Sequence, residues 1–346
     1  YSINSVDTNA CPGLVQNGST VYVIGGRGPG GRSAIKLDGK KDAGELKSLW
    51  STTGGSYVSS PVLTKDHLFW FTERGMGICV DAKTGKELWR APLGKSSSSR
   101  RWGSASSPIL YKDTVIINAS DESETLYALE KSTGKVAWKV KAGGIALTFG
   151  TPGIVQAGKR QDLVIAVPYE IWGLNPDKGT LRWFCEIPMD GNVSPSILAD
   201  QGVVYAFGGY RTRGSVAVRA GGEDDVTKSH LVWKARTSSY VPSPVLHEGH
   251  LYWMNEHGIA FCAEAKTGKV LWSKDLIEDF NGRRPTWGFS GSPLVSDGKV
   301  IVDTGSKDGA LVAMNAKTGD LVWRGGTDEA GYASPMLRAN KPTEIL

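Results

Sequence analysis

Short apolar runs recur along the whole chain, separated by turns rich in glycine, serine and proline. The clearest runs are residues 21–24, 68–71, 114–117, 163–166, 203–206, 251–254 and 299–302. Runs of this length and composition are typical of strands buried on both faces, as between stacked sheets. No segment of ten or more residues shows a convincing 3.6-residue period, so the pattern predicts an almost entirely β chain.

A Ser-Pro-apolar motif, with variations, starts each of eight similar units. Its prolines are Pro12, Pro61, Pro108, Pro152, Pro195, Pro244, Pro293 and Pro335. Successive prolines are 42 to 49 residues apart, which is the length range of one four-stranded propeller blade.

Tryptophans occupy matching places near the ends of seven units. They are Trp50, Trp89, Trp138, Trp183, Trp233, Trp272 and Trp323. In five units a glycine stands four residues before the tryptophan, as in 81–89 and 263–272. This glycine supplies the positive-φ position of a hairpin turn. A tryptophan with a fixed place after the turn is expected to pack against the neighbouring unit.

A longer period lies above the first. Pro12 and Pro195 are 183 residues apart, and so are Trp50 and Trp233. The chain therefore reads as a four-unit block written twice, with halves 12–194 and 195–346. At this shift about twenty residues of the last unit, equivalent to 164–183, are missing. Either the native chain continues, or the N-terminal segment completes part of that blade.

These periods predict one all-β domain over residues 1–346. We expect a single toroid, an eight-bladed β-propeller with tandem four-blade duplication and an incomplete eighth blade.

Charge and composition narrow the classes of function. Forty basic and 35 acidic residues leave a net charge of +5, and no basic run exceeds two residues, so nucleic acid is not an expected partner. No stretch reaches the ~20 apolar residues that span a bilayer. The four cysteines lie far apart without a CxxC pair, so neither a zinc site nor a local disulfide framework is predicted.

The units exemplified by Ser60–Leu63 and Asp81–Trp89 resemble the pyrroloquinoline-quinone-type (PQQ-like) propeller repeat, in which the tryptophan docks one blade on the next. Three branches share that repeat: the quinoprotein alcohol dehydrogenases, the BamB lipoproteins of outer-membrane assembly, and uncharacterised secreted bacterial propellers. The resemblance implies a periplasmic or secreted protein. Quinoproteins of this kind have an adjacent cysteine pair and an aspartate base beside calcium. This chain has no adjacent cysteines, so no cofactor is predicted, and PQQ with calcium is not expected to bind.

Aromatic and arginine residues gather on the loops that precede the Ser-Pro starts, near the expected channel mouth. These loops carry Tyr57, Arg100, Arg101, Trp102, Asn192, Tyr240, Arg283, Arg284, Trp287 and Tyr332. The set predicted to bind a flat or anionic ligand is Tyr57, Arg101, Trp102, Tyr240, Arg284, Trp287 and Tyr332. The alternative is that both tryptophans pack at blade edges and that the arginines are solvated.

The histidines and cysteines are predicted to be structural. His67 and His250 are copies of each other in a turn, and His257 stands beside Glu256 in the next hairpin, so no metal site is expected. Cys79 and Cys262 are likewise copies, expected in the core rather than in a disulfide. The arginine-containing hairpins 27–32 and 211–213 are either partner-docking arms or solvated loops.

No catalytic order of residues stands out in the sequence. The sequence thus favours a non-catalytic binding or scaffold protein, with a protein partner or a small anionic or saccharide ligand. The alternative is an enzyme that uses the channel mouth, either a quinone-dependent dehydrogenase or a carbohydrate-active enzyme.

Overall fold

The chain is all-β, as its apolar pattern predicts. The computed structural model describes residues 11–25, 31–37, 48–95, 102–338 and 341–345. Within these ranges the helical segments are α1 (Ser120–Ser123), α2 (Thr227–His230) and a 3-10 turn, Gly143–Ile145. The chain divides into two compact units: unit 1 comprises Tyr1–Ala146 and Met336–Leu346, and unit 2 comprises Leu147–Pro335. That the chain is a single domain stays a prediction.

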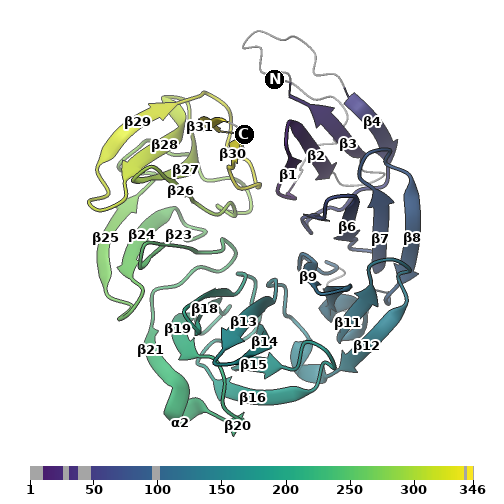
Figure 1. Ribbon diagram of the computed structural model, residues 1–346. Coiled ribbons are helices and arrows are strands. Elements are labelled where there is room, and N and C mark those ends of the chain that lie inside the picture. Colours follow the sequence, from purple (N-terminus) through teal and green to yellow (C-terminus); the bar gives the residue numbers. More distant parts are fainter. Residues whose placement is uncertain (1–10, 26–30, 38–47, 96–101, 339–340, 346) are drawn as a thin grey trace. The chain divides into compact units, whose positions relative to one another are not determined.

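Unit 1 contains three antiparallel four-stranded sheets, called blades 1 to 3, and one two-stranded sheet (Figure 1). Blade 1 consists of β1 (Val15–Asn17), β2 (Thr20–Gly25), β3 (Gly31–Lys36) and β4 (Ser48–Thr53). Blade 2 consists of β5 (Val62–Leu63), β6 (His67–Phe71), β7 (Met76–Asp81) and β8 (Glu87–Pro92). Blade 3 consists of β9 (Ile109–Tyr111), β10 (Thr114–Ala119), β11 (Thr125–Glu130) and β12 (Val136–Lys141). The small sheet pairs β30 (Leu337–Arg338) with β31 (Lys341–Ile345).

Unit 2 contains blades 4 to 7. Blade 4 consists of β13 (Gly153–Ala157), β14 (Arg160–Val167), β15 (Glu170–Leu174), β16 (Leu181–Glu186) and the short β20 (Asp224–Asp225), which pairs with β16 in parallel. Blade 5 consists of β17 (Leu198–Asp200), β18 (Val203–Gly208), β19 (Gly214–Arg219) and β21 (Leu231–Ala235). Blade 6 consists of β22 (Val245–His247), β23 (His250–Met254), β24 (Ile259–Glu264) and β25 (Val270–Asp275). Blade 7 consists of β26 (Leu294–Ser296), β27 (Lys299–Ser306), β28 (Gly309–Asn315) and β29 (Leu321–Gly325).

The prediction of eight blades is wrong: the structure has seven propeller blades. After Pro335 the described chain forms only the two-stranded sheet β30–β31, in which Leu337 pairs with Ile345. A blade needs four strands. Counting Ser-Pro starts overestimates the number of blades, because the motif marks a first strand whether or not three more strands follow it.

The apolar core lies between neighbouring blades. The second strand of each blade is buried on both faces, as in β6, where Leu68, Phe69 and Trp70 are at most 1% exposed. The outer strands instead alternate, so that Leu88 is exposed and Trp89 is buried. Every blade thus covers both faces of its middle strands with the next sheet, which explains the continuous apolar runs in the sequence.

Four tryptophans dock one blade on the next in the same way. The indole N–H groups of Trp50, Trp89, Trp233 and Trp272 donate to the carbonyls of Ala82, Lys131, Ala265 and Ala316, over 2.8–3.0 Å. Each indole also lies on the glycine of the next blade's turn. At Gly85, φ is +71°, and a Cβ would stand 2.6 Å from the Trp50 ring. Turn glycines are therefore required both for their backbone conformation and for space under the indole.

Trp183 differs from these four tryptophans. It is fully buried, and its indole N–H donates to Asp162 Oδ2 of its own blade over 2.8 Å. The Asp162 carboxylate also forms ion pairs with Arg160 and Arg182. Blade 5 has an insertion at the turn position, which supplies β20 to the edge of β16 instead. Trp138 and Trp323 are half-buried in β12 and β29.

Candidate functional site

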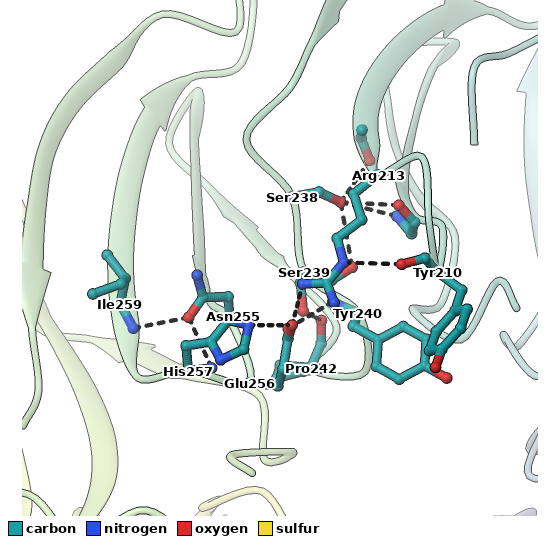
Figure 2. A network of polar contacts seen from close by, with 12 residues as sticks. Tyr210, Arg213, Ser238, Ser239, Tyr240, Pro242, Asn255, Glu256, His257 and Ile259 are labelled. Carbon is teal, nitrogen blue, oxygen red and sulfur yellow. Dashed lines mark hydrogen bonds and ion pairs between the residues drawn. The ribbon is translucent and has the colours of Figure 1, made fainter. Parts of the chain in front are cut away.

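A carboxylate at the tip of the β23–β24 hairpin organises one face of unit 2 (Figure 2). The side-chain oxygen of Asn255 accepts the N–H groups of His257 and Ile259, over 3.1 and 2.9 Å. Gly258, with φ of +98°, completes the turn. These local bonds present Glu256 at the tip of the hairpin.

Three groups from two other segments converge on Glu256. Arg213, beside β19, forms an ion pair with Glu256 Oε1, and His257 Nε2 lies 3.1 Å from the same oxygen. The backbone N–H of Tyr240, in the loop before blade 6, donates to Oε2 over 3.3 Å. The carboxylate thus joins the blade 5 hairpin to the blade 6 loop.

Aromatic rings cover the same junction. The Arg213 guanidinium carbon lies 5.6 Å from the centre of the Tyr240 ring, a cation–π contact. The rings of Tyr210 and Tyr240 are 5.6 Å apart between centres, and Figure 2 shows them side by side. Asn192 donates to the Tyr240 hydroxyl over 2.7 Å. Tyr240 is therefore fixed at its ring, its hydroxyl and its backbone.

Asp190 holds the blade 5 hairpin in place. Its carboxylate accepts the backbone N–H groups of Arg211 and Thr212, each over 2.8 Å. Burial raises the pKa of Asp190, but the hydrogen bonds from Thr212 and Arg211 outweigh it, and the pKa lies below its usual value. Residues 211–213 are thus anchored at their backbone. Of the matching hairpin 27–32, residues 27–30 lie outside the described residues.

An exposed tryptophan stands next to the same hairpin. The backbone N–H of Phe289 donates to the Glu256 carbonyl over 3.2 Å. At Gly288, φ is +84°, and a Cβ would lie 2.7 Å from the same oxygen. This close approach seats Trp287 beside the hairpin, where its side chain is 83% exposed. Arg284, also exposed, precedes it in the loop. We call Tyr210, Arg213, Tyr240, Glu256, His257 and Trp287 the Glu256 surface.

Unit 1 carries a copy of part of this arrangement. The backbone N–H of Tyr57 donates to Glu73 Oε2 over 3.3 Å, as Tyr240 does to Glu256. At Gly103, φ is +75°, and a Cβ would lie 2.5 Å from the Glu73 carbonyl. Trp102 precedes this glycine and is 54% exposed.

The structure thus places the predicted residues in two groups. Tyr240 and Trp287 lie at the Glu256 hairpin, with Arg284 in the Trp287 loop, and Tyr57 and Trp102 lie at the Glu73 hairpin. Tyr332 is half-buried, and its carbonyl accepts a hydrogen bond from Ser290 Oγ over 3.2 Å. Arg100 and Arg101 lie outside the described residues. That these residues bind a ligand stays a prediction.

Sequence reasoning missed the carboxylates that anchor both groups. Glu73 and Glu256 are 183 residues apart, the same distance as Tyr57 and Tyr240. This shared shift was the available signal. It could not identify Arg213 as the ion partner of Glu256, because the equivalent position in the first half is a glycine, Gly30.

Blade 3 contains a buried acidic pair. Asp121 accepts the N–H of Gly103 over 2.9 Å, and Glu122 accepts the N–H of Ser104 over 2.6 Å and the Ser104 hydroxyl. Glu122 is 3% exposed. Burial raises its pKa to about 7, against the opposing effect of the Ser104 hydrogen bonds. The pair fixes the start of the described loop that carries Trp102.

The cysteines and histidines have structural surroundings. All four cysteines are free thiols, and Cys79 and Cys262 are fully buried. Burial raises the pKa of Cys79 to about 12 and that of Cys262 to about 11. His250 Nδ1 lies 2.9 Å from the Glu248 carbonyl in its turn. Over the described ranges, no three His, Cys, Asp or Glu side chains gather as metal ligands. With its cysteines separate, this residue set does not fit a calcium-held quinone. No helix in the described part of the chain is long and apolar enough to cross a membrane.

Comparisons with known proteins agree with the fold. The family model described as outer membrane protein assembly factor BamB matches residues 42–274 and 225–343. The outer membrane protein assembly factor BamB of Yersinia pestis is 22% identical, over 85% of this chain and 84% of that protein. The dehydrogenase subunit of a quinone alcohol dehydrogenase from Komagataeibacter europaeus is 24% identical, over 42% of this chain and 21% of its own length.

A solved structure shows the same fold. The crystal structure of BamB from Moraxella catarrhalis superposes with a TM-score of 0.69 and 15% identity, covering 98% of this chain and 92% of that one. The family model covers most of the sequence, including both copies of the Tyr–Glu–Trp arrangement. The chain therefore belongs to the family of the outer membrane protein assembly factor BamB.

Proposed function

We propose that this chain is a non-catalytic scaffold that binds a protein partner in the assembly of outer membrane proteins. The proposal follows from relatives named as outer membrane protein assembly factors, which also agree with the predicted periplasmic location. The observation that carries it is the Glu256 surface, where Trp287 is 83% exposed beside an ordered arginine and two tyrosines.

The composition of this surface is that of a protein interface. Tryptophan, tyrosine and arginine supply most binding hot spots, because each buries a large area and keeps a polar group for hydrogen bonding. Arg213 is held by Glu256 and by the Tyr240 ring, so little side-chain freedom remains to be lost on binding. The surface is thus preorganised, and Trp287 supplies apolar area still in contact with water.

The shape of the surface favours a protein over a small ligand. Small-molecule sites are concave and bury most of their ligand. Cavities of about 610 and 420 Å³ are lined instead by residues near the first strands, such as Leu14 in unit 1 and Ile154 in unit 2. The predicted saccharide or anionic ligand is therefore the second candidate at this surface.

Site-specific photo-crosslinking tests the proposal in the organism that encodes the chain. A photoreactive amino acid in place of Trp287 should give a cross-linked protein, identified by mass spectrometry as an outer membrane assembly component. A matched probe at Leu181, which is 52% exposed on the outer strand β16, should not give that product. Trp287→Ala should lower outer membrane protein levels, and Leu181→Ala should not. Full function of Trp287→Ala without any specific cross-link would contradict the proposal.

A further inference from the structure

Arg32 is a buried cation in unit 1 whose hydrogen-bonding capacity is mostly unused. It lies in β3 and is only 7% exposed. Its guanidinium carbon stands 5.1 Å from the centre of the Trp70 ring, and its Nη1 donates to the Gly54 carbonyl over 3.0 Å. Its Nε is buried and has no acceptor among the described residues. A guanidinium has five N–H donors, so most of this one's donors have no protein acceptor.

No carboxylate of the described chain forms an ion pair with Arg32. Glu87 is close enough to raise the pKa of Arg32, but burial lowers that pKa by more. The Glu87 carboxylate is already occupied, because Arg90 Nε and Nη2 donate to it over 2.7 and 2.6 Å. A buried charge is normally paired, since removing it from water is unfavourable without compensation. The contact with Trp70 supplies part of that compensation.

The second half of the chain shows that the fold does not need this arginine. Ser215, 183 residues later, occupies the equivalent position in β19 and is also buried. Its hydroxyl donates to the Thr237 carbonyl over 2.8 Å, so it is satisfied. Trp253, the copy of Trp70, packs edge-on against Phe207 instead of under a cation. Blade 1 thus departs from its own copy by adding a buried, incompletely bonded charge.

We propose that Arg32 binds a carboxylate group of a ligand. The free edge of a guanidinium offers two parallel N–H donors, which match the two oxygens of a carboxylate. The surrounding groups add a donor rather than an acceptor, since the Trp70 indole N–H is also buried without an acceptor in the described structure. With 7% of the arginine exposed, only a slender group reaches it: a small free acid, or an aspartate or glutamate side chain of another protein.

Acetate and N-acetyl-aspartyl-methylamide are the probes for these two sources. Each is titrated at constant ionic strength, with sodium chloride as the balancing salt, while the midpoint of thermal unfolding, Tm, is measured. The wild type should show a saturable rise of about 2 °C. Arg32→Ser, which copies the residue of blade 5, should lose that rise. The matched control Arg236→Ser removes an exposed arginine of unit 2 and should keep it.

The outcomes separate the possibilities. Binding of acetate alone identifies a free acid, and binding of both probes shows that a protein side chain reaches Arg32. An equal rise in wild type and Arg32→Ser would overturn the proposal. If Arg32→Ser does not fold, the assigned Arg32 Nε–H resonance of the wild type decides the question. A saturable shift with acetate supports the site, and an unchanged resonance overturns it.

Discussion

Replacing Trp272 by alanine tests how much the inter-blade tryptophan contributes to stability. The side chain is 8% exposed, and its indole N–H donates to the Ala316 carbonyl of blade 7 over 2.9 Å. Truncating a buried tryptophan typically costs about 3–5 kcal/mol. At about 2–4 °C of Tm per kcal/mol for a chain of more than 150 residues, Tm should fall by roughly 6–20 °C. Circular dichroism during heating measures this change.

A neighbouring residue supplies the control. Leu271 precedes Trp272 on the same strand and is 48% exposed. Leu271→Ala should change stability by only about 0.5 kcal/mol, because its side chain is already largely in water. A Trp272→Ala variant that melts within one or two degrees of Leu271→Ala would refute the docking assignment.

The turn glycine under the indole makes the test specific to the contact. At Gly319, φ is +75°, and a Cβ would stand 2.9 Å from the Trp272 ring. Gly319→Ala therefore combines backbone strain of about 1–2 kcal/mol with a clash against the indole. In the Trp272→Ala background the clash disappears and only the strain remains. The two free-energy changes should thus be less than additive in a double-mutant cycle. Additive changes would show that the two residues do not touch.

Three further predictions concern other parts of the chain. Asp162→Ala should destabilise the protein by about 3–5 kcal/mol, because it leaves two arginines and the Trp183 N–H without their shared carboxylate; Asp320→Ala, at an exposed position, is the control, and equal unfolding midpoints in urea would contradict this. Glu122 has a pKa of about 7 in the folded chain against a reference value of 4.5, so the folded state binds the extra proton and stability should fall as pH rises from about 4.5 to 7, by about 2–3 kcal/mol; Glu122→Gln should lose this slope in urea unfolding at several pH values, and an unchanged slope would show that another group is responsible. Purified protein mixed with pyrroloquinoline quinone and calcium should show neither bound-quinone absorbance nor dye-linked alcohol or sugar oxidation, and stoichiometric binding with turnover would replace the scaffold proposal by an enzyme.

The sequence predicts the blades well because their determinants are local and repeated. The Ser-Pro starts, the turn glycines and the tryptophans recur at fixed spacing, and the strands form where the apolar runs stand. The count of eight fails because a start motif says nothing about the strands that follow it. Trp183 differs from the other tryptophans because its partner, Asp162, lies in its own blade and has no repeated signal.

The candidate site was only partly predictable. The tyrosines and tryptophans of the two groups stand on the predicted loops, because the repeat fixes where a loop occurs. Their partners are set by contacts between blades: Arg213 reaches Glu256 across 43 residues of sequence. Arg32 was assigned to a solvated hairpin or docking arm, and the structure buries it against Trp70. A tertiary contact of this kind leaves no spacing that a single sequence can show.

The docking tryptophans give the chain a direction during synthesis. Trp50 and Trp89 in unit 1, and Trp233 and Trp272 in unit 2, each contact a turn that comes later in the sequence. A blade emerging from the ribosome therefore leaves its indole without a seat until about 32 to 44 further residues have been made. A nascent chain stopped between two blades always exposes one unseated tryptophan at its growing end, which is the kind of apolar surface that chaperones bind.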